Sequence, residues 1–149
     1  MKTNRLLFFA FCAITIIHAQ QIPPVTNGWV LFSRVKFSSE LFKELNEYFL
    51  VPQFDDGIRK YENEEILIKG HYLPVDTGTK NSVIISKVPY AACFFCGGAG
   101  PESVAEVQFE TEHPRFKPDQ VIQVSGKLVL NKKDVNHMNF ILKEARLVP

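Results

Sequence analysis

Residues 120–130 read Gln-Val-Ile-Gln-Val-Ser-Gly-Lys-Leu-Val-Leu and give the clearest structural signal in the chain. Side chains alternate between two faces along this stretch, and Ile122, Val124 and Leu128 share one of them. A period of two residues predicts a β-strand. Gly126 lies in the middle of the strand, where glycine typically marks a bulge or a sharp bend. The sequence therefore predicts a strand that bends strongly near its centre.

The strands predicted around this one are short and closely spaced. Residues 65–74 alternate in the same way, and residues 82–88 are nearly all apolar, which predicts a strand buried on both faces. Residues 76–79, Asp-Thr-Gly-Thr, are predicted to form a hairpin turn between them. Residues 105–110 alternate apolar residues with Glu and Gln, which predicts a strand with one solvated face. The final strand is expected at about residues 138–148.

The N-terminal half is less regular. Residues 29–37 begin with Trp29 and alternate in a way that predicts a first strand. The following Ser-Ser pair is a possible helix N-cap, and residues 52–63 have the composition of a loop. A short helix or turn is predicted between them because four apolar residues recur at helical spacing. These residues are Leu41, Phe42, Leu45 and Phe49.

About five or six short strands, one of them bulged by a glycine, favour a small closed all-β barrel. The C-terminal sequence is Val-Ile-Gln-Val-Ser-Gly-Lys-Leu-Val-Leu-Asn, a polar connection, and then Phe-Ile-Leu-Lys-Glu-Ala-Arg-Leu-Val. This ending resembles the last strand pair of OB-fold barrels. The resemblance implies an OB-like barrel. The length of the chain after the predicted signal fits one domain, so we expect a single OB-like domain over residues 20–149, with a short helix or long loop after its first strand. An open β-sandwich of similar strand number is the alternative.

The N-terminus has the pattern of a secretory signal peptide. Lys2 and Arg5 supply positive charge, residues 6–17 form an apolar run too short to span a bilayer, and Ala19 ends a plausible cleavage site. We therefore expect an exported protein, periplasmic or secreted, that loses Cys12 with its signal and keeps no membrane span. An uncleaved membrane anchor is the alternative.

The charge of the exported chain bears on its partners. Cleavage removes two basic residues and no acidic one, which leaves 15 Lys and Arg against 16 Asp and Glu. Proteins that bind nucleic acid normally carry a basic patch, and membrane-tethered segments are polybasic. We expect no nucleic-acid partner; the expected partner is another exported or envelope protein, in an oligomeric state that the sequence leaves open.

The chemically special residues are concentrated in residues 90–103, Tyr-Ala-Ala-Cys-Phe-Phe-Cys-Gly-Gly-Ala-Gly-Pro-Glu-Ser. We call this segment the glycine loop. Cys93 and Cys96 are the two cysteines expected in the exported protein. The spacing Cys-x-x-Cys-Gly is typical of metal-binding knuckles, because both sulfurs can face one point and glycine permits a positive φ. The residues expected to set the loop geometry are Gly97, Gly98, Gly100 and Pro101.

The candidate metal ion is zinc or copper. A closed zinc site needs four ligands, and no second Cys-x-x-Cys follows the first. Two thiolates alone suit a soft ion such as Cu(I). Further candidate ligands come from elsewhere in the chain. They are Glu102 and His71, with His113 and His137 as additional possibilities.

Two other interpretations of the cysteine pair compete with metal binding. The pair could form a disulfide, or two buried thiols, that pins the loop in an oxidising compartment. It could also exchange thiols with a partner. Redox pairs normally lie at the N-terminus of a helix, which lowers the thiol pKa, but Gly-Gly-Ala-Gly-Pro follows this pair and interrupts any helix.

Four segments together resemble one protein family: Trp29, residues 68–74 (Ile-Lys-Gly-His-Tyr-Leu-Pro), residues 93–103, and residues 126–128 (Gly-Lys-Leu). The chain resembles a family of small exported bacterial proteins of unknown function. Distant relatives of that family occur beside metal transport systems, so the resemblance favours metals without implying a reaction. His71 replaces a tyrosine of the family's Gly-Tyr-Tyr-x-Pro pattern, and the resemblance assigns it no role.

These patterns together predict an exported, non-enzymatic binding or accessory module with a functional loop at residues 93–103 that binds a metal ion. A protein-interaction domain with a disulfide-pinned loop is the first alternative. A thiol–disulfide oxidoreductase is the second.

Overall fold

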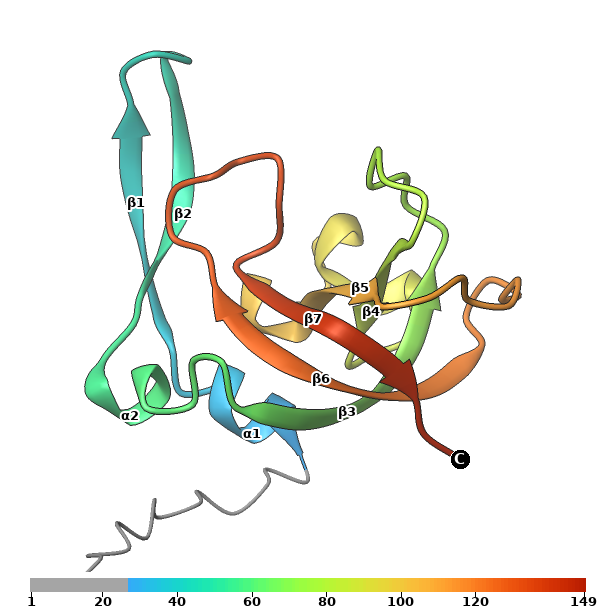
Figure 1. Cartoon of the computed structure of the whole chain (residues 1–149). Helices are drawn as coiled ribbons and strands as arrows, with labels where there is room; N and C mark the ends of the chain where they lie inside the picture. Colours follow the sequence, from blue (N-terminus) through green and yellow to red (C-terminus); the bar gives the residue numbers. More distant parts are fainter. Residues whose placement is uncertain (1–26) are drawn as a thin grey trace, which may run out of the picture.

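The computed structural model describes residues 27–149 (Figure 1). The predicted signal peptide, with Cys12 and Ala19, lies outside these residues. The elements follow one another along the chain in this order: α1 (Gly28–Phe32), β1 (Lys36–Phe42), β2 (Glu47–Gln53), α2 (Asp56–Arg59), β3 (Glu65–Leu73), β4 (Ser82–Ser86), the single-turn 3-10 helices η1 (Tyr90–Ala92), η2 (Phe94–Cys96) and η3 (Pro101–Ser103), β5 (Val104–Phe109), β6 (Val121–Leu130) and β7 (Phe140–Leu147).

Strands β3 to β7 form a closed barrel in the order β3-β4-β5-β7-β6, and β6 pairs with β3 to close it. Every pairing is antiparallel except β5 with β7, which is parallel. This is an OB-like arrangement, so the predicted all-β barrel is confirmed and the open sandwich is wrong. The predicted bulge is also confirmed, because the β6–β7 register shifts between Ser125 and Lys127, on either side of Gly126.

The barrel interior is filled by apolar side chains from all five strands, and α1 packs against it. Trp29 of α1 donates a hydrogen bond from its indole Nε1 to the Lys69 carbonyl oxygen of β3 at 2.9 Å. Phe32 of α1 stacks on Phe140 of β7, with ring centroids 4.1 Å apart. Both phenylalanines are fully buried. The N-terminal helix is therefore fixed to the barrel by one polar and one aromatic contact.

Two predictions for the N-terminal half are wrong. Residues 28–32 form a helix and not a strand, because Trp29 and Phe32, three residues apart, both point into the core while Val30 is exposed. The helix predicted near residues 41–49 is instead the end of the first strand, the turn and most of the second strand of a hairpin, β1–β2. Asn46 lies in the turn with φ of +52°, a value that favours asparagine and interrupts a right-handed helix.

The β1–β2 hairpin stands away from the barrel (Figure 1). Its two strands pair only with each other in the described part of the chain. The base of the hairpin is anchored by Val51, which is buried, and by Phe37, whose ring packs edge-on against Phe140 at 6.5 Å. Its outer half carries large apolar side chains that remain exposed. These are Leu41, Leu45, Tyr48 and Leu50.

The barrel strands agree with the predictions except on one face. All residues of β4 are buried, as its apolar sequence predicts. The solvated face predicted for residues 105–110 is wrong within β5, because Glu106 is buried and Gln108 is half-buried. Residues 131–139, the β6–β7 loop, pack over this face, and Glu106 accepts a hydrogen bond from the Met138 backbone N–H of that loop.

Candidate functional site

The glycine loop joins β4 to β5 and folds into a chain of single turns. Cys93 precedes η2, and its carbonyl oxygen accepts hydrogen bonds from the N–H groups of Cys96 at 3.1 Å and Gly98 at 3.2 Å. Gly97 ends η2 in the left-handed conformation with φ of +75°, as expected for its role in the turn. Pro101 begins η3, which makes one turn before β5 starts. The loop therefore has the local geometry that its sequence predicts.

The two cysteines lie side by side in different surroundings. Both are free thiols, with sulfurs 3.9 Å apart in hydrogen-bonding contact. Cys93 is fully buried in a small apolar cluster with Leu73, Ile84 and Val104. Cys96 is exposed, and its thiol contacts the Tyr90 carbonyl oxygen at 3.3 Å. Cys93 is therefore positioned as an anchor and Cys96 as the accessible thiol.

The environment of Cys96 disfavours its thiolate. The hydrogen bond between the two thiols, followed by burial and by the charge of Cys93, raises the pKa of Cys96 above its ordinary value. Reactive redox cysteines need a lowered pKa, normally from a helix N-terminus or a nearby cation. Only a single 3-10 turn follows Cys93. This geometry gives the thiol little activation.

The other predicted metal ligands are engaged in contacts of their own. His71 on β3 pairs with the Asp119 carboxylate at 3.0 Å, and the Glu102 carboxylate folds back over Gly100. His113 stacks on Phe116, with centroids 5.2 Å apart. Within residues 27–149, no three His, Cys, Asp or Glu side chains converge on a point that could hold a metal ion. The structure therefore provides two neighbouring sulfurs, and the four-ligand site stays a prediction.

A buried carboxylate forms the most extensive polar network near this loop. Glu106 on β5 is 2% exposed. Its Oε1 accepts hydrogen bonds from the Ser82 hydroxyl at 3.1 Å and the Gln108 amide at 2.8 Å. With its proton on Nδ1, His137 donates to both carboxylate oxygens at 3.0 Å, and the Met138 N–H donates to Oε2 at 3.2 Å. One side chain thus connects two barrel strands to the β6–β7 loop.

The network stabilises the charged form of Glu106. Burial alone would raise its pKa, but the hydrogen bonds from Gln108, His137 and Met138, together with the charge of His137, outweigh that effect. The pKa of Glu106 is consequently lower than that of an ordinary glutamate. A carboxylate that is saturated with donors and inaccessible to solvent holds structure together and is poorly placed to move protons.

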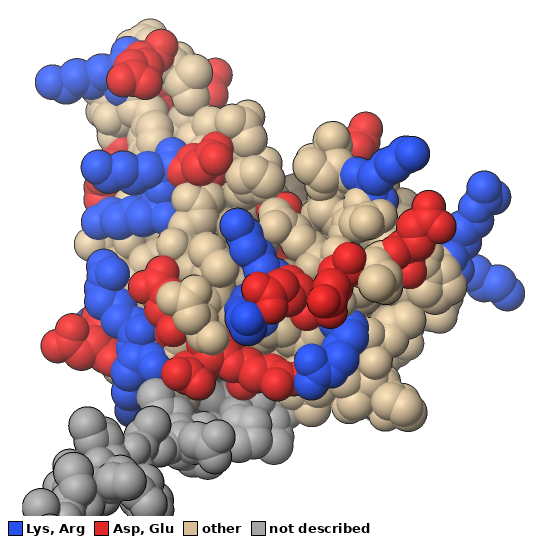
Figure 2. All heavy atoms as spheres, in the orientation of Figure 1, with Lys and Arg blue, Asp and Glu red and all other residues tan. Residues whose placement is uncertain are grey.

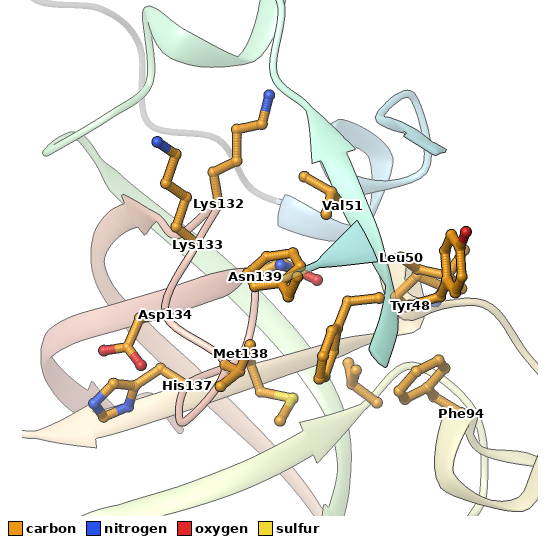
Figure 3. Close-up of a pocket in the computed structure, with 15 residues that line it drawn as sticks. Tyr48, Leu50, Val51, Phe94, Lys132, Lys133, Asp134, His137, Met138 and Asn139 are labelled. Carbon is orange, nitrogen blue, oxygen red and sulfur yellow. The ribbon is translucent and has the colours of Figure 1, made fainter. Parts of the chain in front are cut away.

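A hollow of about 340 Å³ lies where the hairpin, the glycine loop and the β6–β7 loop meet (Figure 3). β2 forms one wall of this space, with Tyr48 and Leu50 on one side of the strand and Val51 on the other (Figure 3). Met138 and Phe94 line it from the other two segments. Lys132 and Lys133 extend side by side from the β6–β7 loop at the rim of this space. His137, in the same loop, also lines it. We refer to this space as the hollow.

Sequence reasoning missed the hollow, its hairpin wall and Glu106. The hairpin was hidden by the coincidental helical spacing of its apolar residues, although the aromatic and β-branched run at residues 48–51 and Asn46 in the turn favour strands. Glu106 follows a period-two pattern that also describes a solvated strand face. Whether such a face is solvated or buried depends on where the β6–β7 loop packs, and no local sequence signal gives the position of that loop.

On the face shown in Figure 2, acidic and basic side chains are interspersed, and no large patch carries charges of one sign only. Among residues 27–149, none of the helices has both the length and the apolar character required to cross a bilayer.

A comparison of the chain with models of known protein families finds no match, and a search of curated proteins finds no similar protein.

The different surroundings of the two cysteines predict different costs for serine. Cys93→Ser places a hydroxyl in an apolar cluster and should lower the free energy of unfolding by about 1–3 kcal/mol. Cys96→Ser changes an exposed group and should cost less than about 0.5 kcal/mol. Urea unfolding of the reduced proteins measures both. If both variants lost the same free energy of unfolding, and only in the absence of reductant, the result would instead identify a disulfide between Cys93 and Cys96.

The lowered pKa of Glu106 predicts a pH-dependent contribution to stability. The charged form stabilises the fold above the ordinary glutamate pKa, and this contribution is lost as the pH falls through the lower pKa of the folded state. Glu106→Gln should therefore cost about 1.5–3 kcal/mol at neutral pH. The difference from the wild type should narrow as the pH falls below about 5.

Chemical denaturation between pH 3 and 8 tests this prediction, with Glu110→Gln, at an exposed position just after β5, as the matched control. The control should follow the wild-type curve at every pH. A gap between Glu106→Gln and the wild type that stays constant with pH would contradict the assignment.

Proposed function

We propose that this chain is an exported, non-enzymatic binding module, and that the hollow with the outer half of the β1–β2 hairpin is its binding surface for another exported or envelope protein. The observation that carries the proposal is the exposure of the hairpin. Tyr48 is 72% exposed and Leu50 50% exposed, on strands that pair only with each other among the described residues. Isolated two-stranded hairpins are marginally stable in water.

A partner that covers this surface would supply the burial that the hairpin lacks. Contiguous exposed apolar side chains rimmed by charges are typical of interaction sites. Phe42 and Phe49 already pack against each other with centroids 5.0 Å apart, so part of the surface is ordered in advance. Tyrosine adds large contact area at a low cost in conformational entropy. The hairpin therefore has the composition of a binding surface.

The titratable groups support a binding role over a catalytic one. Glu106 is buried and holds a lowered pKa, and the pKa of the accessible thiol, Cys96, is raised. A general acid or base needs access to substrate and a pKa near the working pH, and a nucleophilic cysteine needs thiolate character. Neither residue meets these requirements in the described structure.

Site-specific photo-crosslinking tests the binding surface in cells that export the protein. A photo-crosslinking phenylalanine at position 48 should give a discrete product of higher mass, because Tyr48 projects from the hairpin. The same residue at position 121 is the control, since Val121 is 48% exposed on a barrel strand away from the hollow. Products of the same mass and yield from both positions, or none from position 48, would contradict the proposal.

A second candidate function is metal binding by Cys93 and Cys96. Two thiolates bound to one tetrahedral zinc ion at about 2.3 Å lie roughly 3.8 Å apart. The 3.9 Å between these sulfurs is close to that separation. Two thiolates also suit Cu(I). The remaining ligands of a zinc site would come from outside the described residues, including a partner protein, so this candidate is compatible with the first.

Metal analysis of the reduced, purified protein after exposure to zinc or copper tests the second candidate. The wild type should retain metal in a fixed ratio to the chain, and Cys96→Ser should lose it with little change in stability. His71→Ala should retain the metal because His71 is paired with Asp119. Absence of retained metal in the reduced wild type, with both thiols titratable, would remove this candidate.

A disulfide-pinned loop and thiol–disulfide exchange remain the other proposals for the pair. The burial of Cys93 supports a structural role. The raised pKa of Cys96 makes exchange the weaker of the two.

A further inference from the structure

We propose that the hollow accepts an extended segment of the partner protein, which adds as a third strand along the free edge of β2 and carries acidic residues that face Lys132 and Lys133. This inference rests on the proposed function and names the chemistry of the partner at the same surface.

The backbone of β2 is suited to pair with an added strand. Phe37 lies opposite Pro52 in the hairpin register, and proline has no N–H to donate to β1. Antiparallel pairs alternate between hydrogen-bonded and non-hydrogen-bonded positions. The pairs of Leu50 with Ser39 and of Tyr48 with Leu41 therefore belong to the non-hydrogen-bonded set and direct the N–H and C=O groups of Tyr48 and Leu50 away from β1.

Beyond β1, these backbone groups have no partner in the described part of the chain. Outside the β1–β2 ladder, no hydrogen bond within residues 27–149 involves the N–H of Tyr48 or of Leu50, and β2 pairs with no other strand there. The hollow lies along the same edge, because residues from both faces of β2 line it: Tyr48 and Leu50 from one face, Phe49 and Val51 from the other. An unpaired edge beside a hollow is the arrangement used in β-strand addition.

The side chains around the edge define the sequence of the added strand. Successive side chains of a strand point to opposite faces, so every second residue would meet the same wall. On the inner side, Val104, Phe94 and Met138 present apolar surface to the hollow. We therefore expect apolar residues at alternate positions of the bound segment, where they would pack against these three side chains.

Charge distinguishes one end of the hollow. Lys132 and Lys133 extend from the β6–β7 loop at the rim (Figure 3). Neither forms an ion pair within residues 27–149. Asp134, the nearby acidic residue in the same loop, accepts hydrogen bonds from the backbone and side chain of Asn136. A segment with Asp or Glu near one end would match the two lysines.

The test uses a displayed library of random ten-residue peptides, selected on the protein purified after export. The affinities of synthetic versions of the selected peptides are then measured against variants. Leu50→Pro removes one outward N–H from β2. Ser39→Pro is the matched control, because Ser39 is the register partner of Leu50 and its N–H points to the opposite edge of the hairpin.

The expected peptides have alternating apolar residues and at least one acidic residue. They should lose at least about tenfold in affinity for Leu50→Pro and about tenfold for the double variant Lys132→Glu/Lys133→Glu. Ser39→Pro and the charge control Lys80→Glu/Lys87→Glu should stay within about twofold of the wild type. Circular dichroism of each variant verifies that the barrel remains folded.

Three outcomes would overturn the inference. Peptides that lose affinity for Tyr48→Ser but not for Leu50→Pro bind the surface without adding a strand, so the proposed function survives alone. A dimer in sedimentation that Ser39→Pro or Leu50→Pro dissociates would identify a second copy of this chain as the occupant. If no selected peptide distinguishes the wild type from Tyr48→Ser, both the inference and the proposed function fail.

Discussion

The hydrogen-bonded carboxylate of Glu106 is the interaction on which the arrangement around the hollow depends. It accepts donors from β4, from β5 and from the β6–β7 loop, and it is 2% exposed. A buried charge without partners is costly, so each donor is needed to keep the others in place. Because His137 and Met138 are two of these donors, the network fixes the loop that also presents Lys132 and Lys133. The hydrogen bonds of buried Glu106 thus determine the position of the β6–β7 loop, which forms one wall of the hollow.

The Glu106 network also covers part of the outer face of the barrel, which affects where a ligand can bind. In OB-like barrels, the outer face of the second and third strands commonly binds oligonucleotides or oligosaccharides. Here these strands are β4 and β5, and their outer face is covered by the Glu106 network and by the apolar cluster around Cys93. The glycine loop lies over the cluster and contributes Phe94 and Pro101 to the hollow. The binding surface that we propose is therefore displaced from the strands toward the hairpin.

The sequence predicted those parts of the fold in which local patterns and tertiary packing agree. Strands β3, β4 and β6 and the bulge at Gly126 follow directly from alternation and from the mid-strand glycine. The sequence predictions were wrong for α1 and for the hairpin, because a short apolar run fits both the helical and the strand period. Tertiary contacts such as the Phe32–Phe140 stack decide between the two structures. For the site, the local turn at Cys93 and Gly97 was predictable because turn chemistry is local. The burial of Glu106 was not, since it arises from a loop thirty or so residues later in the chain.

We infer that β2 has a free edge beside the hollow, where a strand of a partner protein can pair. Amide hydrogen exchange of the isolated protein tests it most directly. We predict that the amides of Tyr48 and Leu50 exchange rapidly, while those of Val107 and Leu128, in the closed barrel, are strongly protected. Protection of Tyr48 and Leu50 at the level of the barrel strands would show that the edge is already paired, and the proposed binding surface would not be free to receive a partner.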